Sequence, residues 1–144
     1  QIPEELRQDG IEALGILKGR DEVLREYEQA DLVVIPRFLD GLTIKGVEAL
    51  SLGKAIVGHP HAFSGCYQIK NWQEAVIAQD SEEFIAASVK ILNNKLLQRE
   101  LEERAYAFAQ EAFSPMNCYS ELISELKEIK GEVASEVASE VTHA

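Results

Sequence analysis

Apolar residues occur along the chain in two patterns, as short continuous runs and as runs with helical spacing. Continuous runs at 31–36, 54–58 and 74–78 predict strands, and Pro36 ends the first of them. Crowded apolar residues at 11–17 predict a further short strand followed by a turn. We therefore expect about four strands, and the β-branched run at 31–36 indicates burial on both faces of a parallel sheet.

Amphipathic helices are predicted between and after these strands. Their expected ranges are 21–30, 43–52, 81–94, 95–112 and 115–130. Their expected apolar faces hold Val23, Leu24 and Tyr27 in the first helix, Ile44, Val47 and Leu50 or Ala49 in the second, and Phe84, Ile85, Val89 and Leu92 in the third.

Residues with known end preferences mark the limits of several helices. Asp21 is suited to the N-cap of the first helix, and Asp80 or Ser81 to that of the third. Gly53 supplies a C-terminal stop for the second helix, and Pro115 favours a first-turn position in the last.

The alternation of strands and helices predicts a doubly wound α/β fold, because parallel neighbours need crossover connections. Residues 1–130 are expected to form one Rossmann-like domain, incomplete at its N-terminus because so few strands are predicted. The tail at 131–144 is acidic and repeats a four-residue unit. It is interpreted as a frayed helical extension, with a partner-binding helix as the alternative.

Composition narrows the possible partners and compartments. A net charge of −11 argues against nonspecific binding to nucleic acid or anionic lipid. Cys66 and Cys118 have no spacing typical of a disulfide framework or a zinc site. No apolar run has the length of a transmembrane helix and the N-terminal residues do not resemble a signal peptide, so a cytoplasmic protein is expected.

Candidate binding residues follow the strand at 31–36, where ligands of open α/β sheets bind. Gly41 would let the backbone approach a ligand, and the N–H groups of Leu42, Thr43 and Ile44 could cradle phosphate oxygens.

Charged side chains on either side of this loop would complete the site. Lys45 would add a positive charge, and Glu48, one turn later, could accept hydrogen bonds from a vicinal diol such as that of ribose. Arg37 is placed to meet a phosphate or to lie on the surface. A simpler interpretation also stands, in which Lys45 and Glu48 form a solvated ion pair and Asp40–Gly41 is an ordinary turn.

Other residues with possible chemistry are assigned lesser roles. His59 and His61 flank Pro60 and are interpreted as loop histidines that face a cleft at the carboxyl ends of the strands, without a metal. Tyr67 and Trp72 could stack on a base, but such aromatics are more often anchors of a small core.

A combination of motifs from about residue 11 to 128 resembles the group 1 retaining glycosyltransferases of the two-Rossmann-domain (GT-B) type. Asp40 stands eight residues before Glu48, which begins "EALSLGKAIVG" and so follows the family's donor-binding segment. Three further segments are similar to the family in the same order, namely "GILKGRDEVLREYEQADLVVIPR", "IAQDSEEFIAASVKILNN" and "ERAYAFAQEAFSP".

The resemblance implies a C-terminal nucleotide-sugar-binding domain of an enzyme in carbohydrate biosynthesis. It implies that Glu48 holds the ribose of a donor such as a UDP- or GDP-sugar and that Asp40, the catalytic candidate, lies near the donor sugar or diphosphate. It further implies that the N–H groups of Leu42 and Thr43 reach phosphate, with no metal or other cofactor. The acceptor domain is expected upstream, so this chain alone is expected to be inactive.

Three departures from the family pattern accompany the resemblance. Asp40 replaces the commoner glutamate, Ala55 stands where proline is usual, and the upstream basic pair that grips the diphosphate is not in the sequence. Two other functions remain open at this point, a non-catalytic nucleotide or partner binding module and half of a nucleotide-sugar 2-epimerase.

Overall fold

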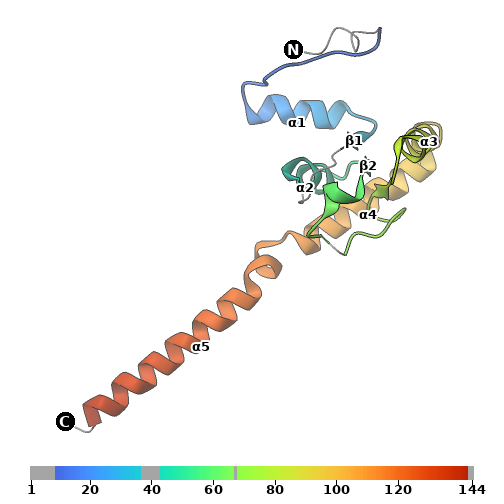
Figure 1. The fold of residues 1–144 in the computed structure, drawn as a ribbon. Coiled ribbons are helices and arrows are strands. Elements are labelled where there is room, and N and C mark those ends of the chain that lie inside the picture. Colours follow the sequence, from blue (N-terminus) through green and yellow to red (C-terminus); the bar gives the residue numbers. More distant parts are fainter. Residues whose placement is uncertain (1–8, 37–42, 67, 143–144) are drawn as a thin grey trace.

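The computed structural model describes residues 9–36, 43–66 and 68–142, with side chains described up to residue 130. In chain order the elements are α1 (Arg20–Gln29), β1 (Val33–Ile35), α2 (Ile44–Ser51), β2 (Ile56–Gly58), the 3-10 helix η2 (Pro60–Phe63), β3 (Val76–Ile77), α3 (Ser81–Leu92), α4 (Lys95–Ala112) and α5 (Pro115–Thr142) (Figure 1). Strands and helices thus alternate through most of the described chain.

The strands form a parallel sheet in the order β1-β2-β3, which confirms the predicted α/β class. Val33 pairs with Ile56, and Val57 pairs with Val76. Each strand is shorter than its predicted range, because only part of each apolar run pairs with a neighbouring strand.

Two apolar clusters lie on opposite faces of the sheet, because successive side chains of a strand point to opposite sides. Ile56 belongs to the first cluster, with Leu50 of α2 and Ala105 of α4. The next residue, Val57, belongs to the second cluster, with Ile91 of α3 and Leu101 of α4. Helices therefore cover both faces, as the prediction of a doubly wound fold requires.

The predicted strand at 11–17 is wrong. These residues form no helix or strand, and Ile16 is 94% exposed. Because no pairing partner or cluster takes up their side chains in the described chain, local hydrophobicity alone did not make a strand.

The predicted helix ends are mostly confirmed, with one correction. Asp80 is the N-cap of α3 and accepts a hydrogen bond from Glu83 N at 2.9 Å. Pro115 is the first residue of α5, and Gly53 follows the end of α2 with a φ of +63°. Asp21 does not cap α1, because the helix begins one residue earlier and its N-cap is Gly19.

The predicted buried faces of α2 and α3 are partly wrong. In α2 the buried residues are Gly46, Ala49 and Leu50, while Ile44 is 78% exposed at the helix start. In α3 the buried residues are Ala87 and Ile91, so the predicted stripe is shifted around the helix. Of that stripe Phe84 is half-buried, whereas the other three members are exposed, namely Ile85, Val89 and Leu92. The central residue of β1, Val34, is also exposed rather than covered.

Helix α5 extends away from the rest of the described structure (Figure 1). It runs without a break from Pro115 to Thr142, so the helical extension predicted for the tail continues α5 up to that residue. Residues 115–130 are all exposed. Over the part of the chain that the structure describes, none of the helices combines the length and the hydrophobicity needed to cross a membrane.

Candidate functional site

The N-terminus of α2 forms the centre of the predicted site. Thr43 is its N-cap, with an extended backbone and a buried side chain whose Oγ1 accepts a hydrogen bond from Gly46 N at 2.9 Å. This cap satisfies one of the N–H groups that a helix leaves without an intrahelical partner. The first-turn amides of Ile44 and Lys45 lie at the same helix end, where the helix dipole favours an anion.

A hydroxyl from another helix approaches the charged residues of α2. Tyr27 of α1 has its hydroxyl oxygen 3.4 Å from Glu48 Oε2 and 3.3 Å from the carbonyl oxygen of Lys45. Burial raises the pKa of Tyr27 above its usual value of 10.0, and the nearby charge of Glu48 and the hydrogen bond to it raise this pKa further. The hydroxyl therefore stays protonated at neutral pH and serves as a donor to the Glu48 carboxylate.

A cleft of about 490 Å³ lies between β1 and the start of α2, beside the Tyr27 ring. Its lining includes Tyr27, Pro36, Thr43, Ile44 and Lys45. A volume within the range of about 300–1,000 Å³ found for small-molecule sites suits a nucleotide-sized ligand. The cleft lies where Pro36 leaves the carboxyl end of β1, the position expected for ligands of open α/β sheets.

Three of the predicted site residues, Thr43, Lys45 and Glu48, are brought together by the structure. Thr43 and Lys45 line the cleft, and Glu48 lies one helical turn after Lys45, next to the Tyr27 hydroxyl. The other four predicted site residues lie outside the described residues, namely Arg37, Asp40, Gly41 and Leu42.

Two details bear on the roles predicted for these residues. The Thr43 N–H donates to the carbonyl of Ala62 in η2 at 3.4 Å, so that amide already has a protein acceptor. Lys45 and Glu48 do not form an ion pair with each other, whereas Lys95 and Asp31 do, at 2.8 Å. The simpler interpretation of Lys45 and Glu48 as a solvated pair stays a prediction, like the roles proposed for them in a binding site.

The two histidines predicted to face the cleft lie against each other. The rings of His59 and His61 stack with centroids 4.9 Å apart, and His59 Nδ1 accepts a hydrogen bond from His61 N at 3.4 Å. Among the described residues, no group of three or more His, Cys, Asp or Glu side chains is placed to hold a metal ion.

Sequence reasoning missed Tyr27 as a site residue. It recognised this tyrosine only as part of the apolar face of a helix. The ring does pack against the first apolar cluster, but the hydroxyl reaches α2, which lies 18 to 21 residues further along the chain. No local sequence pattern predicts this contact, because it depends on how α1 and α2 pack against each other.

Comparison with known proteins found a matching family model and a similar solved structure. The family model described as glycosyl transferases group 1 matches residues 1–108. The structure is similar to the crystal structure of the C-terminal domain of a group 1 family glycosyl transferase (LpcC) from Francisella tularensis, with a TM-score of 0.62 and 14% sequence identity. The match covers 71% of this chain and 53% of that one, so the chain spans about half of that structure. No curated protein matches the chain.

Proposed function

Because the chain belongs to the group 1 glycosyl transferase family, we propose that the cleft at the start of α2 binds the nucleotide part of a nucleotide-sugar donor. The observation that carries this proposal is the Glu48 carboxylate, whose Oε2 lies 3.4 Å from the Tyr27 hydroxyl, one helical turn after Lys45 of the cleft. A helix N-terminus suits a diphosphate, and a fixed carboxylate suits the two hydroxyls of a ribose.

In this proposal, different residues of the site contact different parts of the donor. Lys45 neutralises the diphosphate at the cleft, together with the amides of the first turn of α2. Glu48 accepts hydrogen bonds from the ribose. Thr43 holds the helix end in place through its cap rather than through its amide, which bonds Ala62.

Further parts of the proposal rest on the family resemblance. Asp40 acts beside the donor sugar, Gly41 and Leu42 bring backbone to the diphosphate, and Arg37 meets a phosphate. The sugar passes from a UDP- or GDP-sugar to its acceptor with retention of configuration and without a metal or other cofactor. An N-terminal domain supplies the acceptor side, and the reaction belongs to carbohydrate biosynthesis in the cytoplasm.

A shift titration by NMR spectroscopy tests the binding site. UDP, GDP and ADP are titrated against the chain, with inorganic pyrophosphate as the probe for the phosphate contacts alone. We expect at least one nucleotide to shift the amides of residues 43–48. If saturating concentrations of all three leave these amides unshifted, the proposed donor site is wrong.

Two variants separate the ribose contact from the phosphate contact. Glu48→Gln should weaken nucleoside diphosphate binding and leave pyrophosphate binding unchanged, whereas Lys45→Ala should weaken both. Each lost charged hydrogen bond is worth about 1.5–3 kcal/mol, or roughly ten- to hundredfold in affinity. Glu125→Gln and Lys127→Ala on the exposed face of α5 are matched controls and should change neither affinity. Equal effects of Glu48→Gln on both probes would contradict the ribose assignment.

A separate measurement tests the expected need for an N-terminal domain. The reaction takes place between donor and acceptor sites, so the 144-residue chain by itself should not turn over a UDP- or GDP-sugar. Release of the nucleoside diphosphate by the purified chain, above the rate of an Asp40→Asn variant, would contradict this expectation.

A further inference from the structure

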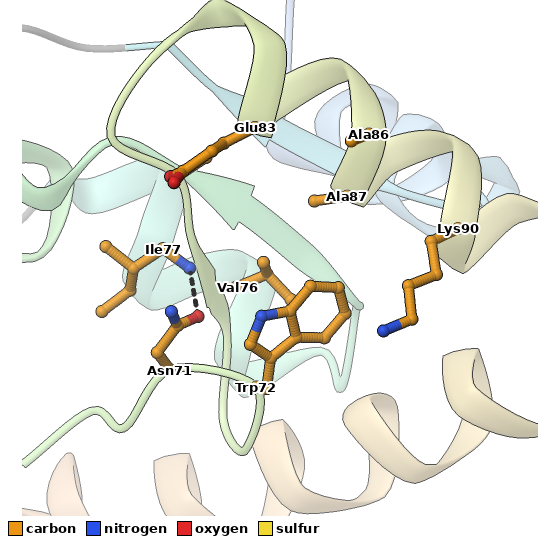
Figure 2. Close-up of a pocket in the computed structure, with 9 residues that line it drawn as sticks. Asn71, Trp72, Val76, Ile77, Glu83, Ala86, Ala87 and Lys90 are labelled. Atoms are coloured by element: carbon orange, nitrogen blue, oxygen red, sulfur yellow. Dashed lines mark hydrogen bonds between the residues drawn. The ribbon is translucent and has the colours of Figure 1, made fainter.

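A second pocket lies at the β3 edge of the sheet, the opposite edge from β1 and its cleft. It is about 270 Å³ in volume and lies between α3 and the loop that leads into β3 (Figure 2). We call it the edge pocket, and six of its lining residues carry the argument, namely Asn71, Trp72, Ile77, Glu83, Ala86 and Lys90. None of these residues takes part in the proposed donor site.

Trp72 adopts a backbone conformation that is unusual for its residue type. Its φ is +61°, and it is the only described residue other than glycine with a positive φ. It occupies the third position of a turn in which Gln73 N donates to the carbonyl of Lys70 at 3.1 Å, a position where glycine is preferred. Backbone strain of this kind persists only where the surroundings impose it, and it concentrates at functional sites.

The strained turn fixes the indole against α3. Trp72 N donates to the carbonyl of Ala75 at 2.9 Å, and the half-buried ring packs against the second apolar cluster. Glu83, Ala86 and Lys90 follow one another on the side of α3 that faces this ring (Figure 2). The small side chain of Ala86 leaves space beside the indole, while the two charged residues stand at the ends of the pocket.

Polar groups surround this apolar surface. Lys90 Nζ lies 4.3 Å from the centre of the indole ring, in a cation–π contact. Asn71 Oδ1 accepts a hydrogen bond from Ile77 N at 2.8 Å, which fixes the other amide atom, Nδ2, as the donor. Glu83 Oε2 accepts from Gln79 N at 2.8 Å, and a carboxylate retains further acceptor capacity after one such bond.

We propose that the edge pocket binds a single acidic sugar ring, such as a hexuronate residue of a glycan. Lys90 moves off the indole face that it covers in this structure, and the apolar C–H face of the sugar lies there on Trp72, next to Ala86. The sugar carboxylate pairs with Lys90, while Asn71 donates to ring hydroxyls and Glu83 accepts from them.

Size and charge favour this ligand over a second nucleotide. The volume of about 270 Å³ falls just below the range of about 300–1,000 Å³ typical of larger small-molecule ligands, so one ring is accommodated. Lys90 is the one cation among the described lining residues, so it can neutralise the single charge of a carboxylate but not the several charges of a diphosphate. A sugar ring with one negative charge and several hydroxyl groups matches this lining. Its carboxylate needs one cation, and its hydroxyl groups need an amide donor and a carboxylate acceptor.

The sequence supplies a reporter for this pocket, because Trp72 is the only tryptophan in the chain. Methyl β-D-glucuronide carries a carboxylate where methyl β-D-glucoside carries a neutral hydroxymethyl group. The two sugars are titrated separately, and the Trp72 indole N–H resonance and the Trp72 fluorescence are followed. We expect the glucuronide to shift the resonance and to bind about tenfold more tightly than the glucoside, because its contact with Lys90 is charged. UDP should leave this resonance unshifted, which separates the edge pocket from the donor cleft.

Variants then assign the contact to individual residues. Lys90→Gln should weaken glucuronide binding about tenfold and should not weaken glucoside binding. Lys127→Gln on α5 is the matched control and should affect neither sugar. Trp72→Gly removes both the strain and the ring, so sugar-induced shifts of the Asn71 and Lys90 amides should disappear while circular dichroism reports a folded chain. Equal affinity for the two sugars, no shift with either, or equal effects of Lys90→Gln and Lys127→Gln would overturn the proposal.

Discussion

The hydroxyl of Tyr27 lies 3.4 Å from Glu48 Oε2 and joins α1 to the helix that carries the proposed ribose contact. The same hydroxyl lies 3.3 Å from the carbonyl oxygen of Lys45, one turn before Glu48. One donor can favour only one of these acceptors at a time, and the charged carboxylate is the stronger. Tyr27 is therefore a positioning residue for Glu48.

Tyr27→Phe tests this positioning role. The phenylalanine ring keeps the packing against the first apolar cluster but removes the donor. Loss of a hydrogen bond of this kind is worth about 0.5–1.5 kcal/mol, so nucleoside diphosphate affinity should fall roughly two- to tenfold. Pyrophosphate affinity should not change. In the Glu48→Gln background Tyr27→Phe should have a smaller effect, and full additivity in this double-mutant cycle would contradict the coupling.

The raised pKa of Tyr27 makes stability fall at alkaline pH. The pKa in the folded chain lies above the unfolded value of about 10, because of burial first and the Glu48 charge second. The neutral hydroxyl is thus favoured by folding, so its contribution is fully present below pH 10 and is lost as the pH rises through the folded pKa. Urea unfolding between pH 8 and 11 measures this loss, which should be smaller for Tyr27→Phe than for the unsubstituted chain.

Thr43 can be tested as a cap independently of ligand binding. Thr43→Ala removes the acceptor for Gly46 N, and losses of this kind cost about 1 kcal/mol of stability. Thr43→Ser keeps the hydroxyl and should retain most of the stability in thermal or urea unfolding. A loss for Thr43→Ser as large as that for Thr43→Ala would show that the methyl group, rather than the cap, stabilises this position.

The fold was largely predictable because its strands and helices carry strong local patterns. The apolar run at 31–36 predicted β1, and the capping pattern at Asp80 predicted the start of α3. The run at 11–17 was equally apolar but has no strand partner in the described chain. The face of α3 was also misjudged, because spacing alone does not tell which side of a helix with apolar residues on several sides meets the sheet.

The candidate site was predictable only where one segment supplies it. Thr43, Lys45 and Glu48 come from one short stretch, so helical spacing places them at one helix end. Tyr27 comes from α1 and Ala62 from η2, and both reach this helix through tertiary packing. Such contacts follow no regular spacing in the sequence, so local patterns do not predict them.

Gly58, the last residue of β2, connects core packing to the site. A Cβ atom added there would lie 2.7 Å from Cε2 and 2.8 Å from Cζ of Phe63, which is buried in the first apolar cluster. Gly58→Ala must therefore displace the ring, and overpacking of this kind costs about 1–3 kcal/mol. Phe63 ends η2, whose Ala62 carbonyl accepts from Thr43 N, so the amide of Thr43 should shift in the NMR spectrum of this variant.

A second background shows whether the aromatic ring is the cause. Phe63→Leu lacks the two ring atoms that approach Gly58, so Gly58→Ala should cost less free energy of unfolding in that background than in the unsubstituted chain. The Phe63→Leu change itself removes buried apolar area, so the comparison is made between the two costs of Gly58→Ala and not between the variants' absolute stabilities. If Gly58→Ala costs the same in both backgrounds, the clash with Phe63 is not what makes glycine necessary at the end of β2.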